Sequence, residues 1–142
     1  MATGTISFYT KFKERLLNKE IDFDSDTFLL ALLQSGYTPA ATHSATTQLT
    51  NEVAAGGYGR VTLGSLALAA TGSAVAWDAG NAVFTASGAA FTAHYWVLID
   101  DTPTGDCLVA YGLLDNSPAS VTVADGNTLT VQWNDNGIFK LD

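Results

Sequence analysis

The longest unbroken run of large apolar residues in this chain is Phe28-Leu29-Leu30-Ala31-Leu32-Leu33. This run is too short to cross a bilayer, which requires roughly 20 apolar residues. Three aspartates precede it, and Gly36 and Pro39 follow it. A short apolar run between turn signals favours a strand that is buried on both faces, and periodicity alone leaves a buried helix as the alternative. Because side chains alternate along a strand, the rest of the chain must cover both of its faces.

The chain is long enough to form that cover within one domain, residues 1–142. A chain of this size buries about two-thirds of the surface that its unfolded form exposes. Hydrophobic residues make up 47% of the sequence and charged residues only 14%, which is not the composition of a disordered protein. So low a charged fraction suggests that a partner covers part of the surface.

The charges are unevenly distributed along the sequence. The whole chain carries −8, yet residues 1–20 carry +2 and the remaining residues carry −10. An acidic body argues against nucleic-acid binding, which depends on Lys and Arg contacts to phosphates. The basic end either steers docking onto an acidic partner or is a solvated helix face.

Because Cys107 is the only cysteine, the chain cannot form an intramolecular disulfide. We expect Cys107 to be a buried thiol. The N-terminus lacks a basic segment followed by an apolar one, so we expect no signal peptide and synthesis in a reducing cytoplasm. We expect no membrane partner.

One helix is predicted near the N-terminus, over residues 7–18, after a flexible segment at residues 1–5. Phe8, Phe12 and Leu16 recur every four residues and form an apolar stripe, with Ser7 as the cap. We expect this stripe to cover one face of the central strand and to leave Lys11, Lys13 and Arg15 pointing outward.

The remaining sequence predicts short strands separated by turn signals. Residues 58–63 alternate, and residues 73–77 and 82–86 flank Asp78-Ala79-Gly80-Asn81 as a predicted hairpin. Residues 91–99 and 106–114 form the second predicted hairpin, and a closing segment follows at 137–141. Residues 119–123 and 128–133 flank a turn at 124–127. Eight or nine strands at this spacing predict a mainly β fold, an antiparallel β-sandwich of the jelly-roll or Ig-like kind with one N-terminal α-helix.

Residues 36–57 form a long, weakly patterned loop rich in Thr, Ala and Gly. Loops of more than about 12–15 residues are uncommon in compact domains and are often functional. We therefore expect this loop to be a binding segment.

The sequence offers little that predicts chemistry. Asp22-x-Asp24-x-Asp26 begins like a calcium loop, but the required Gly and Glu are replaced by Thr27 and Leu33. Cys107 and His94 form a conceivable catalytic pair, although a core thiol and a strand histidine are favoured. Trp77, Trp96 and Trp133 line either a sugar groove or, as we favour, the core. We expect no catalytic residue, metal or cofactor.

Several stretches together resemble small virion proteins of tailed bacteriophages. They are Phe12–Leu17, Ile21–Thr27 with the following apolar strand to Ser35–Pro39, Asn51-Glu52-Val53, Gly57-Tyr58, the Trp77 region, Leu129–Trp133 and Gly137-Ile138-Phe139. Within that group the chain looks like a capsid decoration, or cement, protein. The resemblance covers nearly the whole chain, and its motifs are structural.

The resemblance implies a non-enzymatic protein that binds the major capsid protein on the outer surface of the phage head and stabilises it. A homo-oligomer is implied, with a trimer preferred over a dimer. The alternative is a tail, neck or adhesion module that binds a host-surface ligand. An enzyme is a distant third possibility. We expect capsid contacts from the N-terminal segment, the long loop and the helix, with these candidates: Thr3, Thr5, Lys11, Arg15, Tyr37, Thr38, His43, Gln48 and Asn51.

Overall fold

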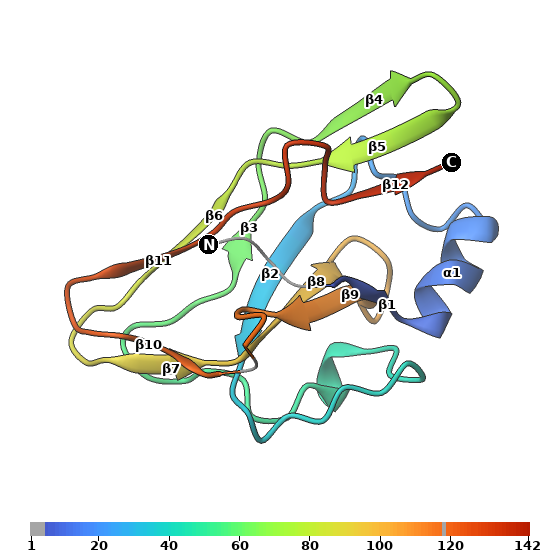
Figure 1. Cartoon of the computed structure of the whole chain (residues 1–142). Helices are drawn as coiled ribbons and strands as arrows, with labels where there is room; N and C mark the ends of the chain where they lie inside the picture. Colours follow the sequence, from blue (N-terminus) through green and yellow to red (C-terminus); the bar gives the residue numbers. More distant parts are fainter. Residues whose placement is uncertain (1–4, 118) are drawn as a thin grey trace.

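The computed structural model, which describes residues 5–117 and 119–142, consists of antiparallel strands and, within those residues, one α-helix (Figure 1). This confirms the predicted β-sandwich with an N-terminal helix. The elements are β1 (Ser7–Phe8), α1 (Thr10–Leu17), β2 (Phe28–Leu33), the 3₁₀ turn η1 (Thr46–Gln48), β3 (Val61–Thr62), β4 (Ala67–Thr71), β5 (Ala74–Asp78), β6 (Ala82–Thr85), β7 (Phe91–Ala93), β8 (Tyr95–Asp100), β9 (Cys107–Leu113), β10 (Val121–Val123), β11 (Thr128–Val131) and β12 (Phe139–Leu141).

The apolar run at residues 28–33 is a strand, β2, and not a helix. It lies in a five-stranded sheet with the order β1-β9-β8-β2-β3. All of its residues are buried except Leu29, which is half-buried, so both faces are covered as predicted. The neighbouring pair β8–β9 is the second predicted hairpin, which the structure confirms.

The C-terminal half of the chain is one long, interrupted hairpin that closes around the turn at residues 101–106. Moving outward from that turn, β8 pairs with β9, β7 with β10, β6 with β11, and β5 with β12. The inner pair belongs to the five-stranded sheet, and the outer three pairs form the second layer (Figure 1). Packing between the layers joins Phe28 to Trp77 and Trp96 to Trp133, with ring centroids 4.9 and 5.4 Å apart.

The predicted hairpin between residues 73–77 and 82–86 is wrong. β5 and β6 follow one another along the same arm of the long hairpin, and neither pairs with the other. The chain reverses instead at Gly72, whose φ of 63° suits a two-residue turn between β4 and β5. Because the chain continues without reversing through residues 78–81, Trp77 and Phe84 both reach the core. The predicted turn at 124–127 exists, but its flanking strands pair with β7 and β6.

The three tryptophans are core residues, as we favoured: Trp77, Trp96 and Trp133 expose at most 6% of their surface. The Trp96 ring lies against Gly112 on the paired strand β9, where an added Cβ would come within 2.7 Å of it. The predicted buried thiol, Cys107, is fully buried.

The helix is shorter than predicted and is placed differently. Ser7 does not cap it, because Ser7 and Phe8 pair with β9 as β1 and α1 starts only at Thr10. The helix packs mainly against β9. Its connection to the central strand runs through Phe23, whose ring centroid lies 5.9 Å from that of Phe12 and 5.2 Å from that of Phe28. Across the described residues, no helix has the length and apolar character that a membrane span requires.

Candidate functional site

The long loop predicted to bind a partner is firmly attached to its own domain. We call residues 34–60 the anchored loop. Its stem is held where Val53 N donates to Leu32 O at 3.0 Å, and its middle where Thr10 N donates to Ala41 O at 2.8 Å. Thr46 Oγ1 adds a hydrogen bond to Asp106 Oδ2 at 3.0 Å. These hydrogen bonds fix the loop against its own domain.

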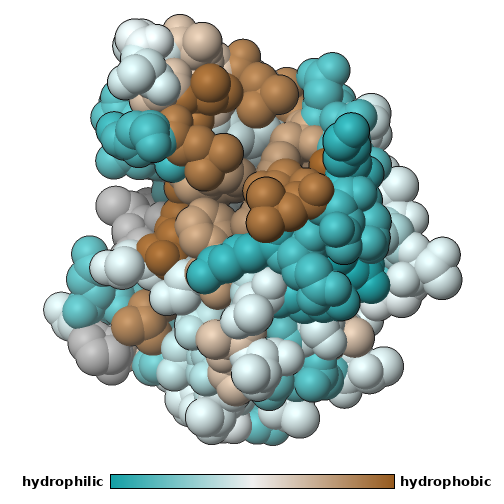
Figure 2. Space-filling model, turned by 90° about the vertical axis from the view of Figure 1, so that its right-hand side faces the viewer, coloured by the Kyte–Doolittle hydropathy of each residue, from teal (hydrophilic) through white to brown (hydrophobic). Residues whose placement is uncertain are grey.

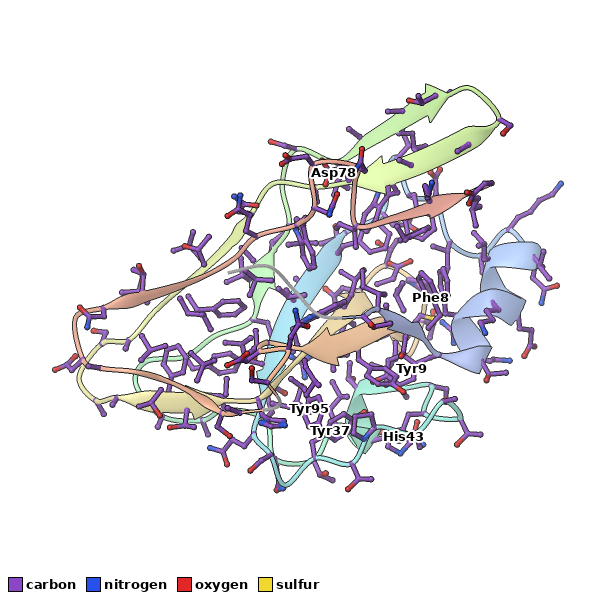
Figure 3. All side chains as sticks on the ribbon, viewed as in Figure 1. Phe8, Tyr9, Tyr37, His43, Asp78 and Tyr95 are labelled. Atoms are coloured by element: carbon purple, nitrogen blue, oxygen red, sulfur yellow. The ribbon has the colours of Figure 1, made fainter. Side chains whose placement is uncertain are left out.

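A buried hydrogen-bond chain fixes the centre of the anchored loop. The Tyr37 hydroxyl lies 2.9 Å from that of Tyr9 and 3.0 Å from His43 Nδ1. Figure 3 shows these three side chains together beneath the five-stranded sheet, with Tyr95 against the Tyr37 ring. Burial raises the pKa of Tyr37, and burial together with the hydrogen bond to Tyr37 raises the pKa of Tyr9. Both hydroxyls are consequently neutral at physiological pH.

The C-terminal end of the anchored loop carries a second polar cluster. Arg60 donates two hydrogen bonds to the Glu52 carboxylate at 2.8 and 2.9 Å, and Tyr58 donates a third at 2.8 Å. Burial by itself would raise the pKa of Glu52, but the hydrogen bonds from Arg60 and Tyr58 outweigh it and hold that pKa below its usual value. The Tyr58 hydroxyl also accepts from Leu32 N, which ties the cluster to β2.

The structure brings together only some of the candidate contact residues. Tyr37 and His43 are joined in the buried chain, and Arg15 reaches the same region by donating to Asp106 O at 3.3 Å. Arg15 is therefore not outward-facing as expected, since its side chain is mostly buried. Lys11 is half-buried and pairs with Glu14 at 2.7 Å. Thr3 lies outside the described residues, and the exposed candidates are Thr5, Thr38, Gln48 and Asn51.

The residues considered as candidates for catalysis or metal binding either lie far apart or stabilise local structure. His94 and Cys107 are at opposite ends of the β8–β9 pair. Burial raises the pKa of Cys107 to about 11, so its thiol stays protonated at neutral pH. Asp22 and Asp26 accept backbone hydrogen bonds inside their own turn. In residues 5–117 and 119–142, no group of three or more His, Cys, Asp or Glu side chains is arranged to hold a metal.

One buried carboxyl has an unusual environment. Asp100 is fully buried, and its Oδ1 accepts from Thr102 N at 3.0 Å. Its Oδ2 has no hydrogen-bond donor in the described part of the chain. Burial, together with the nearby Asp26 carboxylate, raises the pKa of Asp100 to about 7.

The surface that the sequence analysis did not identify lies on β4, β5 and β12, which we call the arm. These strands form a separate sheet with the order β12-β5-β4, and every residue of the edge strand β4 is exposed. Figure 1 shows the β4–β5 hairpin extending away from the body. The signal was present in the sequence, because residues 61–99 contain a single formally charged side chain, Asp78. An uncharged, exposed edge strand is a favourable site for pairing or docking.

Comparisons of the chain with protein-family models, with curated proteins and with solved structures find no match.

Proposed function

We propose that this chain is a structural, non-enzymatic virion protein that decorates the outer surface of a tailed-phage head and stabilises it. The observation that carries the proposal is the arm, which exposes Leu68, Val75 and Leu141 on strands that continue outward from the core. Large apolar side chains grouped on an exposed surface are typical of protein–protein contact sites. The resemblance to phage decoration proteins provides the identity of the partner, the major capsid protein.

The arm suits this role because binding through it requires little change in the domain. Its base is rigid: Trp77 and Phe139 pack against Phe23, with ring centroids 4.8 and 5.3 Å away. Its outer part exposes backbone along β4 and small side chains that allow close approach.

The experiment is to image particles made by the genome that encodes this chain, with and without its gene. We expect the complete particles to carry extra density at regular positions on the head. Heads that lack the protein should lose their DNA at a lower temperature. Density at the tail or neck would instead support the alternative of an adhesion or tail module and would contradict the decoration role.

To identify the binding surface, purified variants are added to heads that lack the protein. Leu68→Ser with Val75→Ser tests the arm, and Thr38→Ala with Gln48→Ala tests the exposed part of the anchored loop. We expect occupancy to fall strongly for the arm variant and only slightly for the loop variant. Full occupancy by the arm variant would overturn the assignment of the arm.

A further inference from the structure

Two turns that are far apart in the sequence lie side by side at the end of the five-stranded sheet where β2 begins. We call residues 22–26 the entry turn; the second turn, at residues 101–106, joins β8 to β9. Asp101 N donates to Thr27 O at 2.9 Å, and Thr27 N donates to Thr102 Oγ1 at 2.7 Å. These two hydrogen bonds hold the turns together.

A pair of carboxyl groups lies between the two turns. Asp26 Oδ2 accepts a hydrogen bond from Asp22 N at 2.7 Å. Asp100 Oδ1 accepts one from Thr102 N at 3.0 Å, whereas Asp100 Oδ2 is buried without a donor among the described residues. A buried carboxylate oxygen without a hydrogen bond is unfavourable. A proton on Asp100 Oδ2 resolves this, because the resulting hydroxyl can donate to the other oxygen of Asp26.

The surroundings of Asp100 favour this protonated form. Burial and the Asp26 carboxylate raise the pKa of Asp100 to about 7, against the hydrogen bonds from Thr102. Cys107, opposite Asp100 on β9, is a neutral thiol at that pH. Further charged side chains come from the two turns and, around Cys107, from α1 and the residues after it: Asp22, Asp101, Asp106, Arg15, Glu20 and Lys11. Asp26 is the charged group that acts on Asp100 itself.

The entry turn also supports the base of the arm, through Phe23. Trp77 Nε1 on β5 donates to Phe23 O at 3.0 Å, and the Phe23 ring lies against the rings of Trp77 and Phe139. Displacement of the entry turn would therefore remove a hydrogen bond and two ring contacts from the arm. The arm carries the binding surface proposed above, and Figure 2 shows hydrophobic residues gathered on the side of the molecule to which its tip projects.

We propose that Asp26 and Asp100 share one proton and form a pH-operated clasp between the entry turn and the turn at residues 101–106. With the proton in place, Asp100 donates to Asp26 and the two turns stay together. When the proton passes to solvent, two carboxylates face each other and repel. The entry turn then moves away, and the base of the arm loosens. The arm is consequently a better binding surface below neutral pH than above it, a consequence that rests on the role proposed for the arm.

The site suits a proton better than a metal ion. Paired carboxyl groups also attract divalent cations, but calcium takes about six to eight oxygen ligands. Asp100 Oδ2 is closed to solvent, and in the part of the chain that the structure describes no third His, Cys, Asp or Glu joins the pair to hold a metal. A proton needs neither room nor further ligands. Added calcium therefore distinguishes the two occupants in the test.

The first measurement is a carbon-13 NMR titration of the aspartate carboxyl carbons in the full chain. Asp26→Asn and Asp100→Asn each replace one carboxyl group with an amide of the same size, and Asp24→Asn, at an exposed position of the entry turn, is the matched control. In wild type the Asp26 and Asp100 signals should shift in one common step near neutral pH, as expected for a coupled pair. In Asp26→Asn, Asp100 should bind its proton at least about tenfold more weakly, a shift of one pKa unit. Unchanged proton binding by Asp100 in that variant overturns the proposal.

The second measurement is hydrogen exchange in β5 and β12, corrected for the intrinsic effect of pH and compared with β6 and β11. Wild type and Asp24→Asn should lose at least about tenfold protection in β5 and β12 between pH 6 and pH 8. Asp100→Asn should not, because its amide can donate to Asp26 at either pH. A loss that β6 and β11 share, or no loss at all, overturns the coupling to the arm.

The last measurement is thermal unfolding at pH 8 with and without calcium. We expect no stabilisation by calcium. Stabilisation that Asp26→Asn abolishes would identify a cation site and overturn proton sharing. All three measurements use isolated protein, so they can fail while imaging supports the decoration role, and imaging can contradict that role while the clasp stands.

Discussion

The anchored loop lies between the paired strands β2 and β3, and the arm forms a separate sheet, yet the two regions use their residues in opposite ways. The loop looks unstructured in sequence, and its Tyr37 exposes only 1% of its surface. The arm looks like ordinary strand sequence, and every residue of β4 is exposed. In the loop, polar groups are directed inward onto the domain. In the arm, apolar groups remain outside it.

The difference shows that sequence pattern alone does not tell which segment is free to bind. A polar loop can be immobilised when its backbone and hydroxyl groups find partners, as Thr46 and Tyr37 do here. A strand of small residues can stay exposed when the sheet beyond the core has nothing to cover it. Substitutions in the two regions should therefore affect different properties, and the following changes test this from the largest expected effect to the smallest.

Tyr37→Ala should destabilise the domain by about 3–5 kcal/mol, because it removes a buried aromatic ring and leaves the hydroxyl of Tyr9 without its partner. Urea unfolding followed by tryptophan fluorescence measures this. Tyr37→Phe is the control, which keeps the ring and should cost about 1–3 kcal/mol. Wild-type stability of the alanine variant would mean that the loop is not anchored.

The body should also respond to pH through Asp100. Its pKa is raised to about 7 in the folded state, so the folded protein binds this proton more tightly than the unfolded chain does. Proton binding by Asp100 therefore stabilises the folded state fully below the unfolded pKa of about 4, and this stabilisation is lost as pH rises through 7. The free energy of unfolding should fall by at most about 4 kcal/mol over that range. Asp100→Asn should therefore be more stable than wild type at pH 8 and show a smaller change between pH 5 and 8. Thermal unfolding of both proteins between pH 5 and 8 tests this prediction. A wild-type protein that becomes more stable toward pH 8 would contradict the raised pKa of Asp100.

Gly72→Ala should weaken the arm alone. The φ of 63° at this turn costs an alanine about 1–2 kcal/mol, and there is open space for the added methyl group. Hydrogen exchange should quicken in β4 and β5 and stay unchanged in β8 and β9. Equal loss of protection in both pairs would show that the arm is not an independent unit.

Leu68→Ser and Val75→Ser should each change the unfolding free energy much less than Tyr37→Ala, by about 0.5 kcal/mol, since both residues are about half exposed. Association and solubility should change instead, which light scattering detects. A loss of stability comparable to that of Tyr37→Ala would remove the distinction between the two regions.

Much of the body could be predicted from the sequence because its signals are local. The run at 28–33 and the alternation of Leu129 and Val131 each identify a strand from its own residues. The pairing of β5 and β6 was mispredicted because Asp78–Asn81 has turn-forming residues, whereas the Gly72-Ser73 turn that was overlooked determines the real hairpin. The burial of Tyr37 depends on Tyr9, which is 28 residues away, and no local pattern contains that information.

The long interrupted hairpin has a consequence for the order in which the chain folds. The turn at residues 101–106 brings β8 and β9 together at low entropic cost, because few residues separate them. Once one pair has formed, the next pair outward has to close only a short loop. The second layer can therefore form in order, from β7–β10 through β6–β11 to β5–β12. The β5–β12 pairing at the base of the arm therefore closes last and should open first.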